Sequence, residues 1–590
     1  MRSSRYPALV FVVIFVAVFL LHAPLLQLPY FWDEAGHYVP AARDLLLSGS
    51  LIPHTTVSNA HPPLVLAWVA LWWKCFGYAP AVARSAMLVI ASFSLLGVFR
   101  LAESVANAPV AIAATVCTAV YPVFFAQSSL AQVDLAAAGL ILWGLTAFIE
   151  RRWGTAAIWF SLAALAKETA ILAPLALVAW QLAGRLKMKS GGLQGLWQSP
   201  EETADRKQVV ALLIPVLPLA AWYCYHYART GYVFGNPEFF RYNVAATLNP
   251  LRFALALILR LWQSFGYLHL WLLTSGMLLA MLLAPVKDGD VERPRISIPV
   301  QALFFVVIAA YVAAMALIGG AVLARYLLPA VPLVIILAVS TLRRRLRYWI
   351  VAVAIVAVAF VAGWFWNPPY GFSPEDNLAY RDYVLLHEDA ERFLEARYPM
   401  AHVLTAWPAS DELTRPWLGY MTRPLQVVRI EDFSLEQVLS AEEFRSNFDV
   451  ALVFSTKYEP AHPLLERWQE WTKLKQRFFG YERDLPAGAA ARILAGRIVF
   501  SEERKGQWVA VIEMEKTEIL NAQRSRDRTL PIQCRPRRCR PNPQSAVEVS
   551  LVMNESQYGC ERTLRESWRE KDVPLILSGA YGDPDFGPGS

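Results

Sequence analysis

Long uninterrupted runs of apolar residues fill the first 366 positions of the chain, and this pattern predicts helices that cross a membrane. A crossing helix needs about 20 predominantly apolar residues, with a range of about 17–25. The runs have about that length, so we expect a polytopic α-helical membrane protein. They occupy residues 7–26, 83–101, 109–127, 131–149, 208–226, 262–285, 298–319, 326–342 and 348–366.

Two further apolar regions do not fit a single crossing. Residues 61–77 are short, carry three Trp and begin with two prolines after His61, so we expect a helix along the outer membrane interface. Residues 154–185 are too long for one crossing and are interrupted by Lys167 and Glu168, so we expect two short helices that meet near Lys167. These choices predict eleven crossing helices with outer interfacial helices.

The charges between the apolar runs predict the orientation. Clusters of Arg and Lys favour the cytoplasmic side of a membrane. Here all of the clusters fall on that side only if residues 61–77 do not cross the membrane. The N-terminus is then cytoplasmic, residues 27–82 form the first outer loop, and the chain after residue 366 lies outside. Arg2 and Arg5 fit an uncleaved first crossing helix better than a signal peptide. The clusters are Arg151 with Arg152, residues 184–189, Arg206 with Lys207, residues 287–295 and residues 343–347.

Beyond residue 366 the pattern becomes that of a soluble domain. Short apolar runs alternate with amphipathic helical segments, which predicts a small α/β domain with a partly parallel sheet at about 372–516. The segment 520–590 is rich in Arg, Pro, Ser and Asn, so we expect a disordered tail. The strand-like runs are 402–406, 425–430, 449–455, 497–502 and 507–515, and the helix-like segments are 434–446 and 463–478.

Composition removes several alternatives. The chain is 56% hydrophobic and only 17% charged, and its net charge of +7 comes from basic clusters between apolar runs, so we expect no nucleic-acid partner. Six Cys are too few for a disulfide scaffold, and Cys534 and Cys539 have the wrong interval for a CxxC site. We expect no cofactor; a divalent metal is compatible with the sequence, but no motif indicates one.

Charged residues gather at the predicted outer ends of the helices. A charge within a crossing helix costs about 2.5–3.5 kcal/mol at its centre, so each of these residues needs a physical reason. The predicted outer face carries Asp33, Glu34, His61, Arg84, Asp134, Lys167, Glu168 and Arg325.

Local explanations exist for each of these residues. Asp33 and Asp134 could be carboxylates at helix starts, and His61 could cap a helix before its two prolines. Lys167 and Glu168 could form an ion pair with each other, and Arg325 could be an interfacial anchor. A shared functional site is favoured over these local explanations because all of these charged residues lie on one predicted face.

Transfer chemistry on a lipid-linked phosphate suits such a face. A polyprenyl-phosphate sugar keeps its tail in the bilayer and its head at the interface, where Arg and Lys at helix ends can bind the phosphate. The acceptor hydroxyl needs a general base, and a carboxylate can serve. A transporter or flippase for a lipid-linked sugar is the alternative class, although a transporter would place charges at the bilayer midplane between related halves.

The order of these motifs resembles the GT-C superfamily of polyprenyl-phosphate-sugar glycosyltransferases. Over about residues 7–366, "DE" follows the first apolar run, then come "HPP" at 61–63, an Asp that starts a later helix, "KE" and "RYLLP". Among its members, the chain looks most like bacterial relatives of protein O-mannosyltransferases and aminoarabinose transferases. The resemblance implies a bacterial inner-membrane enzyme with its α/β domain in the periplasm.

The resemblance also implies roles for individual residues. Asp33 would act at the reaction centre with Glu34 beside it. The donor phosphate would be bound by His61, Lys167, Arg325 and Tyr326, and the sugar or acceptor pocket would be shaped by Asp134, Glu168 and Arg84. The expected reaction transfers a monosaccharide, with inversion, to an extracytoplasmic lipid, glycan or protein. The chain lacks the "EKPP" motif of the aminoarabinose enzymes, so a metal at this site is not expected.

Overall fold

The computed structural model describes residues 7–189, 206–235, 249–318, 321–460 and 468–515. Residues Met1–Leu520 form one compact unit, in which an all-helical part is followed by an α/β part. The second unit, Asn521–Ser590, lies outside the described residues, as does the predicted disordered tail.

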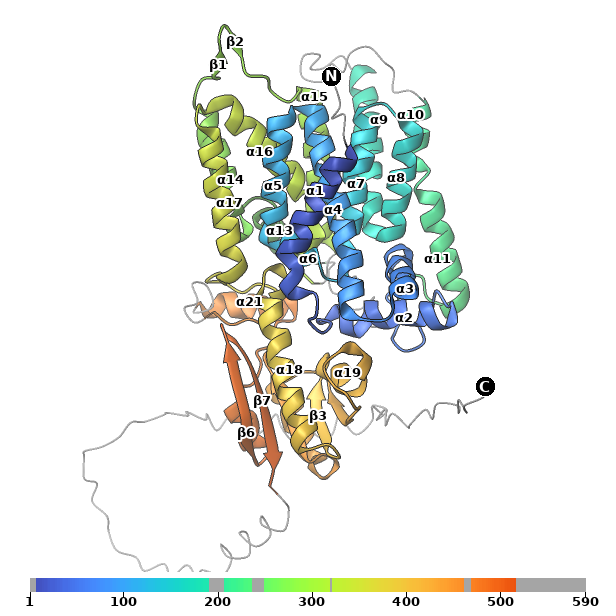
Figure 1. Cartoon of the computed structure of the whole chain (residues 1–590), viewed down its shortest axis with the longest axis vertical. Helices are drawn as coiled ribbons and strands as arrows, with labels where there is room; N and C mark the ends of the chain where they lie inside the picture. The colour runs from blue at the N-terminus through green and yellow to red at the C-terminus, as the bar shows by residue number, and fades with distance from the viewer. Residues whose placement is uncertain (1–6, 190–205, 236–248, 319–320, 461–467, 516–590) are drawn as a thin grey trace, which may run out of the picture. The chain divides into compact units, whose positions relative to one another are not determined.

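The helical part places most of its helices side by side (Figure 1). Short turns of other helix types connect some of them, and these turns carry several of the predicted site residues. The helices are α1 (Pro7–His22), α2 (Val39–Ser48), α3 (Leu64–Phe76), α4 (Pro80–Val105), α5 (Ala108–Val120), α6 (Pro122–Gln127), α7 (Asp134–Ile149), α8 (Trp153–Ala166), α9 (Leu172–Lys189), α10 (Arg206–Leu213), α11 (Val216–Thr230), α13 (Pro250–Phe265), α14 (Leu270–Met281), α15 (Ile298–Ile318), α16 (Val331–Arg345) and α17 (Trp349–Phe365).

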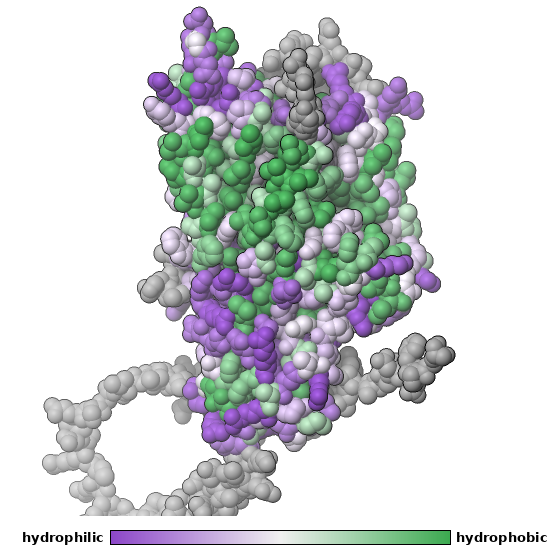
Figure 2. Space-filling model, viewed as in Figure 1, coloured by the Kyte–Doolittle hydropathy of each residue, from purple (hydrophilic) through white to green (hydrophobic). Residues whose placement is uncertain are grey.

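Within the described residues, five helices are long and apolar enough to cross a membrane. The prediction of helices that can cross a membrane is therefore confirmed, whereas the count of eleven crossing helices stays a prediction. A broad hydrophobic band over the helices separates two hydrophilic ends (Figure 2). The five are Pro7–Leu25, Pro80–Val105, Arg206–Thr230, Pro250–Met281 and Ile298–Ile318.

Breaks within helices explain where the sequence pattern was ambiguous. The predicted region 154–185 forms α8 and α9, which meet at Lys167 as expected. The predicted helix at 262–285 is instead two helices, because α13 begins earlier, at Pro250, and ends at Phe265. Leu268 and His269 adopt positive φ angles of 44° and 70°, and this break separates α13 from α14. In 109–127, Pro122 separates α5 from α6, since proline cannot donate a backbone hydrogen bond.

The two ends of the helical part differ in chemistry. At one end, β1 (Lys287–Asp288) and β2 (Val291–Glu292) form a small hairpin, where Arg344 pairs with Glu292 at 2.8 Å. The opposite end carries α2, α3 and the α/β part (Figure 1). Two predicted basic clusters, residues 287–295 and 343–347, therefore lie together and away from the α/β part.

The α/β part contains a five-stranded sheet in the order β4-β3-β5-β7-β6. β3 pairs in parallel with β4 and β5, while β7 is antiparallel to β5 and β6, so the sheet is partly parallel. The strands are β3 (His402–Ala406), β4 (Gln426–Ile430), β5 (Val450–Phe454), β6 (Gly496–Arg504) and β7 (Gln507–Met514), and the helices are α18 (Ala379–Arg397), α19 (Ala409–Thr414), α20 (Leu435–Glu443), α21 (Gln469–Phe479) and α22 (Ala487–Ile493).

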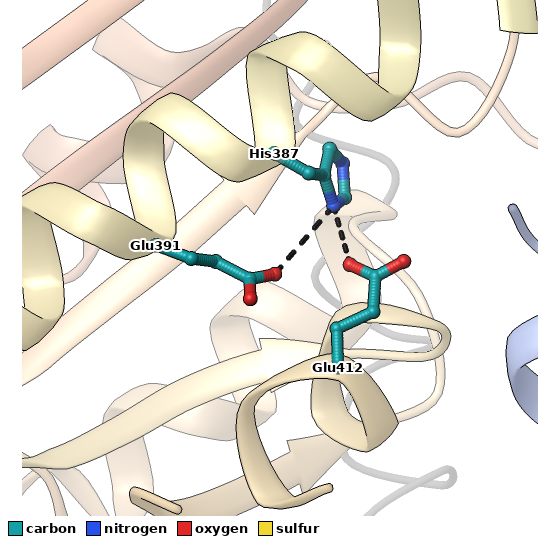
Figure 3. A group of neighbouring side chains, drawn as sticks. All are labelled: His387, Glu391 and Glu412. Atoms are coloured by element: carbon teal, nitrogen blue, oxygen red, sulfur yellow. Dashed lines mark hydrogen bonds and ion pairs between the residues drawn. The ribbon is translucent and has the colours of Figure 1, made fainter. Parts of the chain in front are cut away.

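Helix α18 was not predicted, although it is the longest helix of the α/β part. Its buried side includes Tyr383, His387 and Glu391, and the last two lie one turn apart facing α19 (Figure 3). Polar residues at core positions weaken the apolar pattern from which a helix is predicted. The predicted helix at 463–478 is described only from residue 468 onward, where α21 begins at Gln469.

Candidate active site

The predicted site residues lie at breaks between helices rather than inside them. Asp33 precedes a short π-helical turn, Glu34–Tyr38, and its side chain makes no capping hydrogen bond. Asp134 is the first residue of α7, Lys167 follows α8, and Arg325 lies in a 3-10 turn, Ala324–Leu327, before α16. Irregular turns of this kind occur often at functional sites.

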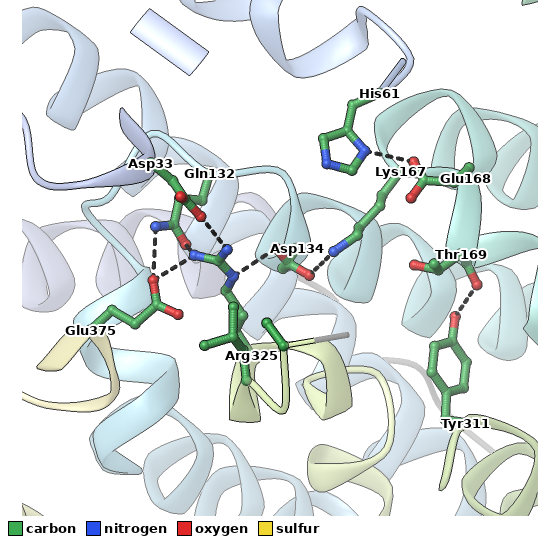
Figure 4. A network of polar contacts seen from close by, with 12 residues as sticks. Asp33, His61, Gln132, Asp134, Lys167, Glu168, Thr169, Tyr311, Arg325 and Glu375 are labelled. Carbon is green, nitrogen blue, oxygen red and sulfur yellow. Dashed lines mark hydrogen bonds and ion pairs between the residues drawn. The ribbon is translucent and has the colours of Figure 1, made fainter. Parts of the chain in front are cut away.

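Arg325 is the centre of a buried polar network (Figure 4). Its Nη2 donates to Oδ2 of Asp33 at 2.5 Å, and its Nη1 donates to Oε2 of Glu375 at 2.5 Å. Nη1 also donates to Oε1 of Gln132 at 2.5 Å, while Nε lies 3.4 Å from Oδ2 of Asp134. One guanidinium thus joins segments that are far apart in the sequence, and it is not an exposed interfacial anchor.

Lys167 extends the network on the other side of Asp134. Its Nζ donates to Oδ1 of Asp134 and lies 4.1 Å from the ring centroid of Tyr326. The centroid of the same ring lies 5.7 Å from Cζ of Arg325, so both cations contact one aromatic ring. Lys167 therefore pairs with Asp134 rather than with its neighbour Glu168. We call Asp33, Gln132, Asp134, Lys167, Arg325, Tyr326 and Glu375 the Arg325 cluster.

His61 and Glu168 form a second contact beside the Arg325 cluster (Figure 4). Oε2 of Glu168 lies 2.8 Å from Nδ1 of His61, and the imidazole stacks with Tyr38 at 5.9 Å. The residue before α3 is Pro63, so His61 does not cap this helix. A surface pocket next to it is lined by residues that include His37, His61 and Trp222.

Glu34 belongs to a different network from its neighbour Asp33. Its carboxylate is completely buried and accepts backbone N–H bonds from Phe31 at 2.9 Å and Ala131 at 2.6 Å. Arg84, also completely buried, approaches it at 3.4 Å and donates to Leu28, Pro29 and Ser129 carbonyls. Glu34 and Arg84 therefore stabilise the first outer loop, and their contacts do not include Arg325.

Sequence reasoning missed Glu375, which lies in the turn Pro374–Asp376 that leads into the α/β part. Besides Arg325, its Oε2 accepts from Nε2 of Gln132 at 3.1 Å. The neighbouring Asp376 accepts from the hydroxyl of Tyr267 at 2.6 Å. The available signal was position: the acids of "PED" follow the last apolar run much as Asp33 and Glu34 follow the first.

The carboxyl groups of the cluster differ in pKa. Burial raises the pKa of Asp33, but Arg325 and His37 together outweigh it and hold this pKa below its usual range. At Glu375 burial dominates over Arg325 and raises the pKa to about 7, and burial with nearby Glu375 raises the pKa of Asp376 to about 8. At neutral pH Asp33 is therefore the charged partner, while Glu375 and Asp376 can hold protons.

Comparison with known proteins identifies the fold. No family model and no curated protein matches the chain. The structure is similar to that of ArnT from Cupriavidus metallidurans bound to undecaprenyl phosphate, with a TM-score of 0.51 and 14% sequence identity over 86% of this chain and 98% of that one. The apo state of the same protein gives a TM-score of 0.50 and 16% identity over 85% and 98% of the two chains.

At this level of identity the likeness concerns the fold rather than the chemistry. It extends over nearly all of ArnT, so the α/β part is included in the aligned length. The chain therefore has the same fold as ArnT.

Proposed function

We propose that the chain is a membrane glycosyltransferase that moves a monosaccharide from a polyprenyl-phosphate donor to an extracytoplasmic acceptor. The observation that carries the proposal is the pair of buried cations, Arg325 and Lys167, held by Asp134 at the breaks between helices. A lipid phosphate could present its oxygens to these two cations while its tail stays in the bilayer. The binding of undecaprenyl phosphate by ArnT, which has the same fold, supports this donor class.

The donor phosphate would exchange places with a carboxylate at Arg325. A guanidinium binds phosphate with two parallel hydrogen bonds, as it binds a carboxylate. Glu375 is the partner that leaves most readily, because its raised pKa lets it take a proton near neutral pH. Lys167 and His61 would contact the remaining phosphate oxygens, and the Tyr326 ring would keep both cations in position.

Asp33 would act as the general base. Its side chain is 22% exposed, the largest exposure among the three carboxylates around Arg325, so an acceptor hydroxyl can reach it. When a phosphate takes the place of Glu375 at Arg325, its negative charge offsets the guanidinium charge that lowers the pKa of Asp33, so Asp33 becomes a stronger base. The acceptor oxygen then bonds to the anomeric carbon, its proton passes to Asp33, and the lipid phosphate leaves with the electrons of the broken bond. A single displacement inverts the anomeric carbon.

Other predicted residues would serve this site indirectly. Asp134 orients both cations, and Glu168 orients His61. We leave Glu34 and Arg84 out of the chemistry because their buried contacts fix the first loop. We further propose that the end with α2, α3 and the α/β part faces the periplasm of a bacterial inner membrane, since the basic hairpin end suits the cytoplasm.

A transfer assay tests the proposal directly. Purified protein in lipid nanodiscs would be incubated with polyprenyl-phosphate sugars labelled in the sugar, together with lipid, glycan and peptide acceptors. We expect label to leave the polyprenyl lipid and to appear on one acceptor class, with Arg325→Lys slower by at least about 10²-fold, because a point charge replaces the two-pronged contact. The matched control Arg483→Lys changes an arginine that is 71% exposed, and should transfer normally.

Label that stays on the lipid with every donor and acceptor would contradict the proposal. If the same protein in vesicles moves the labelled lipid between leaflets, the chain is a flippase instead. Equal transfer by wild type and Arg325→Lys would show that Arg325 does not bind the donor phosphate.

A further inference from the structure

Three side chains of the α/β part form a buried cluster outside the candidate active site (Figure 3). His387 and Glu391 lie one turn apart on α18, and Glu412 comes from α19. Nδ1 of His387 lies 2.6 Å from Oε2 of Glu412 and 3.9 Å from Oε1 of Glu391. Their potential ligand atoms all lie within 4.8 Å of one another, and each side chain is at most 1% exposed. We call these three residues the His387 cluster.

Several buried polar atoms of the His387 cluster have no hydrogen-bond partner outside it. Among the described residues, Oε1 and Oε2 of Glu391, Oε1 of Glu412 and Nε2 of His387 bond to no residue outside the cluster, and within it the carboxyl groups of Glu391 and Glu412 contact each other. A buried polar atom without a partner costs free energy, and a buried charge costs more. Figure 3 shows one oxygen of each carboxyl group directed at Nδ1 of His387, so three potential ligand atoms face one another in a buried space.

Positive charge is also missing there. In the part of the chain that the structure describes, neither Glu391 nor Glu412 forms an ion pair with a lysine or arginine. The imidazole is held in place by stacking on Tyr383 at 4.0 Å and by an edge contact with Phe454 at 4.5 Å. The cluster is thus a rigid set of one nitrogen and two carboxylate ligands that lacks a counter-charge.

We propose that His387, Glu391 and Glu412 bind a divalent first-row transition metal, with Zn²⁺ as the best match. Zinc takes imidazole nitrogen at about 2.0–2.1 Å and carboxylate oxygen at about 2.0–2.2 Å, and three protein ligands with an added water complete its coordination. Ligand atoms around such an ion lie about 3.3–3.5 Å apart by tetrahedral geometry. The 2.6 Å contact would open slightly and the 3.9 Å contact would close as the ion enters.

The metal would fasten α19 to α18. Residue Trp407, just before α19, packs against Gly36 and Trp32 of the loop that carries Asp33. A cross-link between α18 and α19 therefore fixes the segment that supports this loop. The site is structural in this proposal, and it does not depend on the proposed transferase activity.

Metal analysis of the full chain tests the proposal. After tag removal, the protein would be incubated with Zn²⁺, desalted, and assayed for metal by mass spectrometry and for thermal unfolding. We expect about one Zn²⁺ per wild-type chain, and a fall in unfolding temperature of about 5 °C or more when a chelator removes it. His387→Ala, Glu391→Gln and Glu412→Gln should each lose the metal, while the control Glu388→Gln on the same helix should keep it.

A proton shared between the two carboxyl groups is the competing explanation, and Glu391→Gln separates the two. Glutamine imitates a protonated carboxyl, so a shared proton predicts a variant as stable as the wild type and a wild type without metal. That result, or less than about one tenth of an equivalent of Zn²⁺, Co²⁺ or Mn²⁺ bound by the wild type, would overturn the proposal. Loss of both metal and stability in Glu391→Gln would support it.

Discussion

The Arg325 cluster and the His387 cluster both bury carboxylates, but they differ in what neutralises them. In the Arg325 cluster, two permanent cations, Arg325 and Lys167, face three carboxylates. In the His387 cluster, two carboxylates face only an imidazole. The balance of charge, and not the mere presence of acids, therefore indicates the ligand. Two cations whose partners include Glu375, a carboxyl that can take a proton near neutral pH, suit an incoming anion, whereas carboxylates around one nitrogen without Lys or Arg suit a cation.

The largest expected effect separates the adjacent acids Asp33 and Glu34. Asp33→Asn removes the proposed base and should lower transfer by about 10²–10⁴-fold, with a smaller loss of stability than Glu34→Gln, because Arg325 keeps Glu375 and Asp134 as partners. Glu34→Gln leaves Arg84 buried without its counter-ion and should lower the stability by roughly 3–5 kcal/mol, while the folded fraction still transfers. Transfer rates per folded molecule and thermal unfolding of both variants provide the measurement.

The opposite result for either variant would contradict the role assigned to it. If Asp33→Asn transfers at the wild-type rate but unfolds more easily, the Arg325 cluster is structural and resembles the His387 cluster in role. If Glu34→Gln is stable but inactive, the base has been assigned to the wrong neighbour.

A smaller effect concerns the pH dependence of stability in the Arg325 cluster. Burial raises the pKa of Glu375 to about 7 from an ordinary value of 4.5, so the folded protein binds a proton that the unfolded chain releases. The stabilisation from this group is complete below about pH 4.5 and is lost as the pH rises through about 7, with a size on the order of 1–3 kcal/mol. Glu375→Gln imitates the protonated form and should flatten this loss.

Thermal unfolding between pH 4.5 and 8 measures that change. Burial raises the pKa of Asp376 to about 8, so this residue still makes stability depend on pH in the variant. The fall in unfolding temperature with rising pH should therefore become smaller in Glu375→Gln without disappearing. The control Glu470→Gln removes a carboxylate that is 62% exposed and should leave the slope unchanged. An unchanged slope in Glu375→Gln would mean that this carboxyl is charged in the folded protein.

Sequence patterns predicted the parts of the fold that depend on local periodicity. The five strands and most of the apolar runs follow directly from the spacing of apolar residues and appear close to the expected positions, whereas the runs at 109–127 and 262–285 are each broken into two helices. Asp33, Asp134, Lys167 and Arg325 could be collected on one face because loop charge fixes the alternation of ends. Their partners could not be predicted: Lys167 pairs with Asp134, 33 residues away, rather than with the adjacent Glu168.

One physical reason explains why Glu375, His387 and Glu391 were not predicted from the sequence. Glu375 joins Arg325 across 50 residues, and only the folded chain brings the turn after α17 back to the start of α16. His387 and Glu391 have the spacing of one helical turn. This spacing indicates a site only when α18 is known to be a helix and Glu412 of α19 is known to lie next to His387. Composition and cysteine spacing carry no information about a site built from His and Glu.

The smallest expected effect tests whether the segments supporting the two clusters are coupled. A Cβ on Gly36 would lie 2.6 Å from the ring of Trp407, closer than any side chain tolerates, so Gly36→Ala must displace the indole. The clash should cost about 1–3 kcal/mol and slow transfer by several-fold to about tenfold. Trp407→Ala alone should have a milder effect, because it removes the ring without moving Gly36.

The double variant decides the matter. If Gly36→Ala acts through Trp407, adding Trp407→Ala relieves the clash, and the double variant should transfer faster than Gly36→Ala alone, giving a coupling energy of about 0.5–3 kcal/mol. The control Gly488→Ala has no atom within 4 Å of its new methyl group and should be neutral. Strict additivity would mean that the α/β part can shift without affecting the Asp33 loop, and that the proposed metal stabilises only its own part of the chain.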